Sequence, residues 1–227
     1  MKPVRVVCGT RASDEDFFLK SATGISLVTH QYFNPFELRL FSKNSQGLST
    51  IYNIAIEEAR ESPAILVFVH DDVHFCDVQW SHQIAEAVRM FDIVGVAGNA
   101  RRVPRQPSWL FIDEHFTGDE KRFLSGIVGN GKGFPYEISN FGPSRRACKL
   151  LDGLLLAVDS DRLIQSGVRF DEQFDFHFYD LDFCRQAELA HLTMGTWPLS
   201  VVHGSNGDFR SPGWRHMLTR YREKYAD

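Results

Sequence analysis

Six consecutive apolar residues, Ala64 to Val69, restrict the fold of this chain more than any other feature of its sequence. A strand that is apolar at every position is typical of a parallel sheet covered on both faces, so we expect this strand to be central. The polar residues His70, Asp71 and Asp72 follow it directly. Because ligands of open α/β sheets collect at the carboxyl ends of the strands, the sequence predicts a binding site here.

The first hundred residues alternate between two kinds of element. The apolar spacing from Leu48 to Ala59 predicts a helix, which Ser62-Pro63 ends. Further helices are predicted at 14–20 and 80–89, and further strands at 4–8, 25–29, 37–42 and 93–97. Such alternation is typical of a doubly wound α/β fold with right-handed crossovers.

The remaining residues are less regular. Residues 98–150 contain Pro, Gly, basic and aromatic residues without a clear period, and long irregular segments of this kind usually carry function or move. Regular elements are predicted again after them, namely a strand at 154–158, a helix from Asp161 to Gly167, a helix from near Asp180, a pair of strands over 194–203 and a final helix from Trp214.

The composition excludes several classes of protein. With 227 residues the chain has the size of one domain, and its net charge of −4 argues against a nucleic-acid-binding protein, since that affinity comes from basic residues. The longest apolar run is far shorter than the roughly 20 residues of a membrane-spanning helix. A charged residue interrupts the start before an apolar signal-peptide region forms, so we expect a cytoplasmic protein without a transmembrane segment. The four cysteines form no Cys-x-x-Cys pair, which argues against a zinc or redox site.

Three polar clusters are candidates for chemistry. The adjacent carboxylates Asp71 and Asp72 repel each other unless a cation neutralises them, and Mg²⁺ or Mn²⁺ is the natural partner of oxygen ligands. Asp180 and Asp182 open a predicted helix, where residues two apart do not share a face, so that one can point into a pocket while the other caps the helix. His203 leaves a strand before a glycine-containing loop and can ligate a metal or contact phosphate. Each cluster has a structural alternative. Asp71 and Asp72 can form a solvated turn, and Asp180 and Asp182 can simply stabilise the positive end of a helix. His203 can be an ordinary surface or core histidine.

Together these segments resemble the GT-A glycosyltransferases, and within them a family-two-like prokaryotic group that includes capsule-biosynthesis and streptomycin-biosynthesis-type proteins. The resemblance spans most of the chain and is carried by Asn44-Ser45-Gln46-Gly47-Leu48, Asn53 and Phe68-Val69-His70-Asp71-Asp72-Val73. It implies a GT-A fold, which is a Rossmann-like, doubly wound and mostly parallel sheet with helices on both faces, in a single domain. It also implies that residues 1–100 form a nucleotide-binding half and residues 101–227 an acceptor-binding half.

The resemblance assigns roles at the donor site. In the family's Asp-x-Asp motif the last carboxylate binds the metal ion that bridges the donor's diphosphate, and Asp72 stands at that position. His70 stands at the first position of the motif, where Asp71 can take over its contact. His203 corresponds to a histidine near the metal and the diphosphate. The implied donor-binding residues are Thr10, Arg11, Asn44, Gly47, Asn53, His70 and Asp71.

The resemblance also assigns roles at the acceptor site. The segment Leu151 to Val158 is similar to a stretch that lines the sugar and acceptor site, which implies sugar or acceptor binding by Asp152 and Gly153, together with Asp182. The segment Tyr179-Asp180 resembles a Glu-Asp motif whose Asp is the catalytic base, so Asp180 is the candidate base and Tyr179 replaces the Glu. Aromatic residues of the irregular segment are candidates for a sugar-stacking wall or a lid, or for the core of a surface subdomain: Trp109, Phe111, Phe134 and Tyr136.

The implied activity is an inverting, metal-dependent transfer, by preference of a hexose, from a nucleoside-diphosphate sugar to the hydroxyl of a glycan, lipid-linked or small-molecule acceptor. Bacterial surface polysaccharide or glycoconjugate biosynthesis is the expected setting, and the basic pairs Arg101-Arg102 and Arg145-Arg146 would meet a membrane-bound acceptor at the inner membrane face. One alternative is a metal-dependent nucleotide or phosphoester hydrolase with the ligands His70, Asp71, Asp72, His74 and His203. Another is a module that binds a nucleotide-sugar without turnover.

Overall fold

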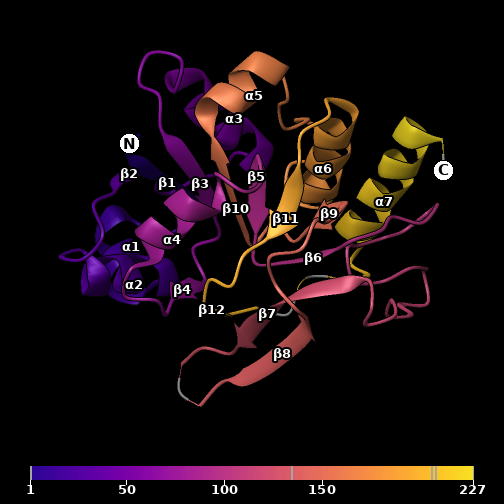
Figure 1. Cartoon of the computed structure of the whole chain (residues 1–227), viewed down its shortest axis with the longest axis horizontal. Coiled ribbons are helices and arrows are strands. Elements are labelled where there is room, and N and C mark those ends of the chain that lie inside the picture. Colours follow the sequence, from indigo (N-terminus) through magenta and orange to yellow (C-terminus); the bar gives the residue numbers. More distant parts are fainter. Residues whose placement is uncertain (1, 134, 206, 208, 227) are drawn as a thin grey trace.

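The apolar run forms strand β3 (Ile65–Val69), and all five of its residues are buried. The sheet around it also contains β1 (Val4–Gly9), β2 (Glu37–Phe41), β5 (Ile93–Gly95), β10 (Leu155–Asp159) and β11 (Met194–Thr196). In the computed structural model, which describes residues 2–133, 135–205, 207 and 209–226, the strand order is β11-β5-β10-β3-β1-β2 (Figure 1). All pairs are parallel except those of β10, which runs antiparallel to β3 and β5. The predicted α/β fold with a mostly parallel sheet is therefore confirmed.

Helices pack on this sheet. Helix α3 (Leu48–Glu58) contacts β1 and β3, and α5 (Ser160–Ser166) contacts β10. Helix α5 ends at Gly167, whose left-handed φ of 72° suits a residue without a Cβ atom. Further helices are α1 (Asp14–Lys20), α4 (Trp80–Ala87), α6 (Tyr179–Leu189) and α7 (Pro212–Tyr225). The helices predicted near these residues are confirmed.

The predicted strand at residues 25–29 is wrong, because the segment belongs to helix α2 (Ala22–His30). Its β-branched residues favour a strand locally. However, the Ser21 hydroxyl caps the helix by accepting a hydrogen bond from an amide of the first turn (2.9 Å). The Thr23 amide also donates to the carbonyl oxygen of Asp71 (3.1 Å), which ties α2 to the end of β3. A capping residue and a tertiary contact thus outweigh the local strand propensity.

A second sheet includes parts of the segment 98–150, so the expected irregular structure is wrong for the β-hairpin within 124–142, whereas residues 100–123 contain no named strand or helix. Its strands are β4 (Val73–Phe75), β6 (Ala97–Asn99), β7 (Leu124–Asn130), β8 (Glu137–Gly142), β9 (Leu150–Leu151) and β12 (Val201–His203). The order is β4-β12-β7-β6-β9, and β8 pairs with β7 to form the hairpin at the bottom of Figure 1. Glycines interrupt the alternation of apolar and polar residues that would indicate strands in this region. A Cβ atom at Gly126 would lie 2.0 Å from the carbonyl oxygen of Val96, so these backbones approach only because glycine is present.

The basic pair Arg101-Arg102 is held by acids of the same chain. Arg101 donates to the buried carboxylate of Asp119, and Arg102 pairs with Glu188 at 3.4 Å. These contacts fix the segment that follows β6, so both side chains have partners within the protein. No helix in the described ranges is long and apolar enough to cross a membrane.

Gly47 allows a close approach between the start of α3 and the loop before α6. A Cβ atom there would lie 2.6 Å from the Cβ of Asp175 and 2.8 Å from its Cα. We expect Gly47→Ala to lower the free energy of unfolding by about 1–3 kcal/mol, because the loop has to shift. Gly118→Ala is the matched control, since nothing lies within 4 Å of a Cβ at Gly118, and it should change the free energy by less than about 0.5 kcal/mol. Urea denaturation measures both, and equal stability of the two variants would contradict the tight approach.

Candidate metal centre and active site

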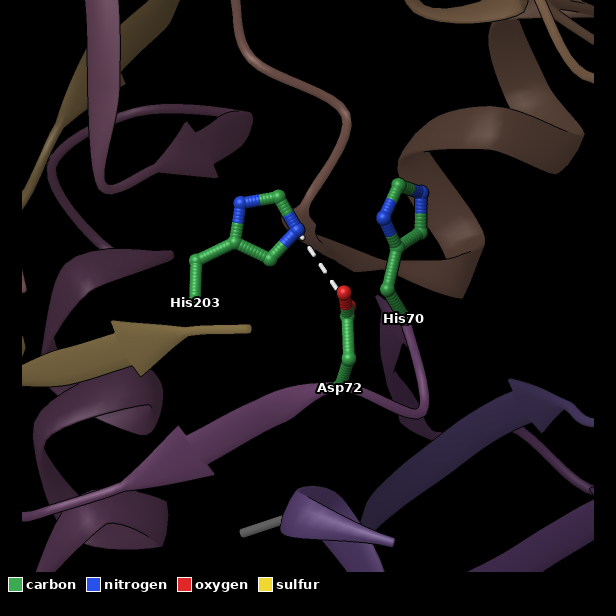
Figure 2. Close-up of side chains that lie close together, drawn as sticks. All are labelled: His70, Asp72 and His203. Carbon is green, nitrogen blue, oxygen red and sulfur yellow. Dashed lines mark ion pairs between the residues drawn. The ribbon is translucent and has the colours of Figure 1, made fainter. Parts of the chain in front are cut away.

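The ends of β3 and β12 bring His70, Asp72 and His203 together (Figure 2). His70 follows β3, Asp72 precedes β4, and His203 is the last residue of β12. The antiparallel pairing of β4 and β12 places His203 opposite Val73, and the Gly204 amide donates to the carbonyl oxygen of Asp72 (2.8 Å). As a result, Nε2 of His203 lies 3.2 Å from Oδ1 of Asp72. One ligand atom of each of the three residues lies within 4.8 Å of the other two.

Asp72 is the ionised member of this cluster at neutral pH. Burial alone would raise the pKa of Asp72, but the hydrogen bond to His203 and the charges of both histidines lower that pKa to about 2. Burial and the charge of His203 lower the pKa of His70. An ionised carboxylate beside two half-buried imidazoles offers one oxygen and two nitrogen ligands. This donor set fits a divalent metal ion.

Asp180 lies in a cavity of about 510 Å³. It is the second residue of α6, and its carboxylate oxygens accept hydrogen bonds from the amides of Gly153 (3.0 Å) and Leu181 (2.9 Å). Burial and, next, the negative charge of Asp152 raise the pKa of Asp180 to about 7. A carboxylate with this pKa is suited to accept and release a proton near neutral pH.

Asp152 lies in the same cavity, where Trp109 holds it in place. The indole Nε1 of Trp109 donates to Oδ2 of Asp152 (2.8 Å), and the Leu154 amide donates to Oδ1 (3.0 Å). His70 and His203 line this cavity as well. Four of the residues predicted for catalysis, sugar binding and metal binding therefore line one cavity, namely Asp180, Asp152, Gly153 and His203.

Aromatic side chains make up much of the wall of this cavity. The lining includes Trp109, Phe141, Phe176, Phe178, Phe209 and Trp214. Of the aromatic residues expected here, Trp109 is in the lining, whereas Phe111 packs against Phe116 and Tyr136 lines a second cavity. Phe134 lies outside the described residues. The sequence pattern did not reveal the last two members of the lining, because they lie in and just before the C-terminal helix.

The second cavity has a volume of about 830 Å³ and includes Asp71 and Asp72 in its lining. Lys20 and Lys132 also line it, and Lys20 forms an ion pair with Asp16 (2.7 Å). Ser205 lines both cavities, and its hydroxyl lies 3.1 Å from Nε2 of His203. We call the candidate metal ligands His70, Asp72 and His203 the metal cluster. This cluster lies where the two cavities meet. Sequence reasoning missed Ser205, although its position two residues after His203 in the same loop was a usable signal.

Three of the predicted donor-binding residues meet at the carboxyl end of β1. The Thr10 hydroxyl donates to Oδ2 of Asp71 (2.6 Å), and the Thr10 carbonyl oxygen accepts a bond from the Asn44 amide (2.8 Å). Arg11 follows Thr10 and is exposed. These side chains border the metal cluster, because Asp71 lies between His70 and Asp72 in the chain.

Other predicted residues make contacts within the fold instead. Gly47 packs against the loop before α6, and the Asn53 amide group donates to a backbone carbonyl oxygen of the segment after α5 (2.8 Å). Asp182 is fully buried and accepts hydrogen bonds from Lys224 (2.5 Å) and Tyr225 (2.6 Å) of α7. The lining of neither cavity includes Asp182, which docks helix α7 onto α6.

Two aromatic residues hold His70. The Tyr179 hydroxyl lies 2.7 Å from Nε2 of His70 and donates to the carbonyl oxygen of Gly153 (2.8 Å). The ring of Phe176 stacks on the imidazole, with 6.2 Å between ring centroids and 22° between the planes. The crowding of aromatics before Asp180 was the available sign of this arrangement, but the sequence did not identify His70 as their partner.

Comparisons with known proteins support the fold. No family model matches the chain, and no curated protein matches it. Among solved structures, S. aureus TarS is 12% identical with a TM-score of 0.52, over 96% of this chain and 38% of the TarS chain. A structure of TarS 1–349 in complex with UDP is 13% identical (TM-score 0.49, 96% of this chain and 63% of that chain), and A197 from STIV is 10% identical (TM-score 0.47, 92% and 97%). The likeness to the TarS structure with a TM-score of 0.52 shows a fold of the GT-A type.

The contrast between Asp182 and Asp180 can be tested in a matched pair of variants. We expect Asp182→Asn to lower the free energy of unfolding by about 1–3 kcal/mol, because Lys224 loses its buried partner, and the partial exposure of Lys224 limits the cost. Asp180→Asn should leave stability at pH 7 within about 1 kcal/mol of the wild type, since the amide resembles the protonated acid. Urea denaturation at pH 7 checks both values, and the reverse order of stabilities would reject these placements.

Proposed function

We propose that this chain is a metal-dependent glycosyltransferase that moves a sugar from a nucleoside-diphosphate sugar to a hydroxyl group of an acceptor. One observation supports the proposal best. Asp180, whose pKa of about 7 suits a general base, shares a cavity with His70 and His203 of the metal cluster. A GT-A-like fold around that cavity agrees with this activity.

The metal cluster would hold the donor's phosphates at the boundary of the two cavities. His70, Asp72 and His203 would bind the cation, which when present stabilises negative charge on a departing diphosphate by several kcal/mol. We assign the nucleotide to the side of Asp71, where the second cavity has a volume within the range of small-molecule sites. Lys20 and Lys132 in its lining have the charge that phosphates require.

The transfer step uses the carboxylates of the first cavity. Asp180 removes the proton of an acceptor hydroxyl, whose oxygen forms a bond to the anomeric carbon while the bond from that carbon to the diphosphate oxygen breaks. The proton stays on Asp180, the nucleoside diphosphate leaves, and the configuration inverts. A general base placed in this way contributes about 10²- to 10⁴-fold to the rate. Asp152, held by Trp109, is positioned to accept a hydrogen bond from a sugar hydroxyl.

The acceptor in this proposal is a glycan, a lipid-linked sugar or a small hydroxyl compound of bacterial surface polysaccharide or glycoconjugate biosynthesis. The largely aromatic lining of the first cavity suits such a molecule. A metal-dependent hydrolase has less support, because two-metal sites need ligands for two ions about 3.5–4 Å apart. Within the described ranges one group of three ligands comes together, His74 is not part of it, and Asp71 is engaged by Thr10.

Donor binding should depend on the metal ligands. We expect one of UDP, GDP, dTDP or CMP, at about 100 times its dissociation constant and with Mn²⁺, to add roughly 2.7 kcal/mol of stability and to raise the melting temperature by roughly 5–10 °C. Asp72→Ala should abolish the shift, because it removes the ionised ligand of the cluster. The exposed Glu61→Ala is the control and should keep it. A thermal-shift panel with and without Mn²⁺ measures this, and the absence of any shift in the wild type would reject the donor site.

Activity should depend on the ionisation of Asp180. Burial raises the pKa of its carboxyl group to about 7, and only the ionised form can accept a proton. We therefore expect the rate of sugar transfer to fall about tenfold per pH unit below pH 7 and to level off above it. Asp180→Asn should lower the rate by about 10²- to 10⁴-fold above pH 7 and remove this pH dependence, so that its deficit shrinks at lower pH. Product formation measured from pH 5 to 9 checks this, and a fully active Asp180→Asn variant would exclude Asp180 as the base.

A further inference from the structure

We propose that the metal centre selects a transition-metal ion such as Mn²⁺, Co²⁺ or Zn²⁺ over Mg²⁺, and that Tyr179 is the positioning residue that presents Nδ1 of His70 to this ion. The inference deepens the proposed function by specifying the metal on which it rests. It follows from the two hydrogen bonds that link His70, Tyr179 and Gly153, and from the identity of the three ligands.

The hydrogen bonds of Tyr179 determine the tautomer of His70. A tyrosine hydroxyl has one proton, and that proton is donated to the carbonyl oxygen of Gly153 (2.8 Å), which can only accept. Nε2 of His70 lies 2.7 Å from the same hydroxyl and must therefore carry the proton of that contact. In the neutral imidazole the lone pair then lies on Nδ1, which is free to bind a metal.

The ring of His70 is turned so that this nitrogen faces the other two ligands. Figure 2 shows the ring nitrogen next to Cγ pointing toward His203 and Asp72, while the second nitrogen points away from them. His203 directs its Nε2 to Asp72 at 3.2 Å. The cluster thus offers two imidazole nitrogens and one carboxylate oxygen to a single ion.

This donor set discriminates between metals. Mg²⁺ prefers oxygen ligands, whereas imidazole nitrogen suits transition metals, whose affinity for such ligands rises from Mn²⁺ toward Cu²⁺. The neighbouring carboxylate of Asp71 accepts a short hydrogen bond from Thr10 (2.6 Å), which engages one of its oxygens outside the cluster. The site is therefore poorer in oxygen than a site made of paired carboxylates.

Tyr179 is rigid enough to fix the ring of His70. Its side chain is 3% exposed and contacts the rings of Tyr52 and Phe170, each with 6.0 Å between ring centroids. The hydroxyl fits because Gly153 has no side chain, since a Cβ there would lie 2.4 Å from it. Hydrogen-bond partners of metal-binding histidines typically affect metal affinity by 10- to 100-fold.

Metal binding without nucleotide tests the inference directly. Titration calorimetry of the whole chain should show that Mn²⁺ binds at least about tenfold more tightly than Mg²⁺. Pulsed electron paramagnetic resonance of the Mn²⁺-loaded protein should detect coupling to the nitrogen of two imidazoles. His70→Asp should lower the ratio of Mn²⁺ to Mg²⁺ affinity by about tenfold and remove the coupling of one imidazole.

Tyr179→Phe keeps the buried ring and removes only the hydroxyl. We expect it to weaken Mn²⁺ binding by about tenfold, with weaker coupling to His70, because the ring can then rotate or change tautomer. His74→Ala is the control, since it removes a nearby histidine that is outside the cluster, and it should leave affinity and coupling unchanged. Circular dichroism of each variant verifies folding, and His70→Asp decides the question if Tyr179→Phe does not fold.

Two results would overturn the inference. Equal affinities for Mn²⁺ and Mg²⁺ in the wild type would reject the selectivity, and unchanged nitrogen coupling in His70→Asp would reject the role of His70. Neither measurement uses a nucleotide. A protein that binds Mn²⁺ through two imidazoles but no nucleoside diphosphate would therefore reject the proposed transferase and leave this inference standing.

Discussion

The burial of β3 on both faces is the constraint on which the whole site depends. Unpaired polar side chains are costly in such a strand, so the first polar residues, His70 to Asp72, stand at its carboxyl end. Strand β1 ends at the same edge and supplies Thr10, and β12 brings His203 through its pairing with β4. Because His70 follows β3, Asp72 precedes β4 and His203 ends β12, short hydrogen-bonded strands position the three candidate metal ligands.

The two residues that depart from the pattern of the GT-A resemblance contact each other. His70 stands after β3 and Tyr179 at the start of α6, each where the resemblance has an acid, and they are 109 positions apart in the chain. A carboxylate at position 179 would add negative charge beside Asp152 and Asp180, whereas the tyrosine hydroxyl is neutral and can accept from an imidazole. The two side chains therefore form a hydrogen-bonded pair that adds no negative charge to this part of the cavity.

The sequence predicts those parts of the site that depend on the pattern of residues within a single strand or helix. The apolar strand before His70 and the acids at the start of α6 are local features, and both lie where the pattern indicates. The contact between Trp109 and Asp152 joins two loops that are 43 positions apart in the chain and has no local sign, and the glycines of β7 removed the alternation that would have revealed a strand. Helix α2 was missed because the Thr23 contact with the end of β3 is also non-local.

The pKa values of two carboxylates of the site are shifted in opposite directions by their surroundings. A hydrogen bond to His203 lowers the pKa of Asp72 to about 2, whereas burial and the charge of Asp152 raise that of Asp180 to about 7. Because the two pKa values lie far apart, Asp72 stays charged near neutral pH, whereas Asp180 can accept and release a proton. Trp109, in the segment between β6 and β7, holds the carboxylate of Asp152, whose negative charge adds to burial in raising the pKa of Asp180. This segment thus contributes to the proposed chemistry as well as to the cavity wall.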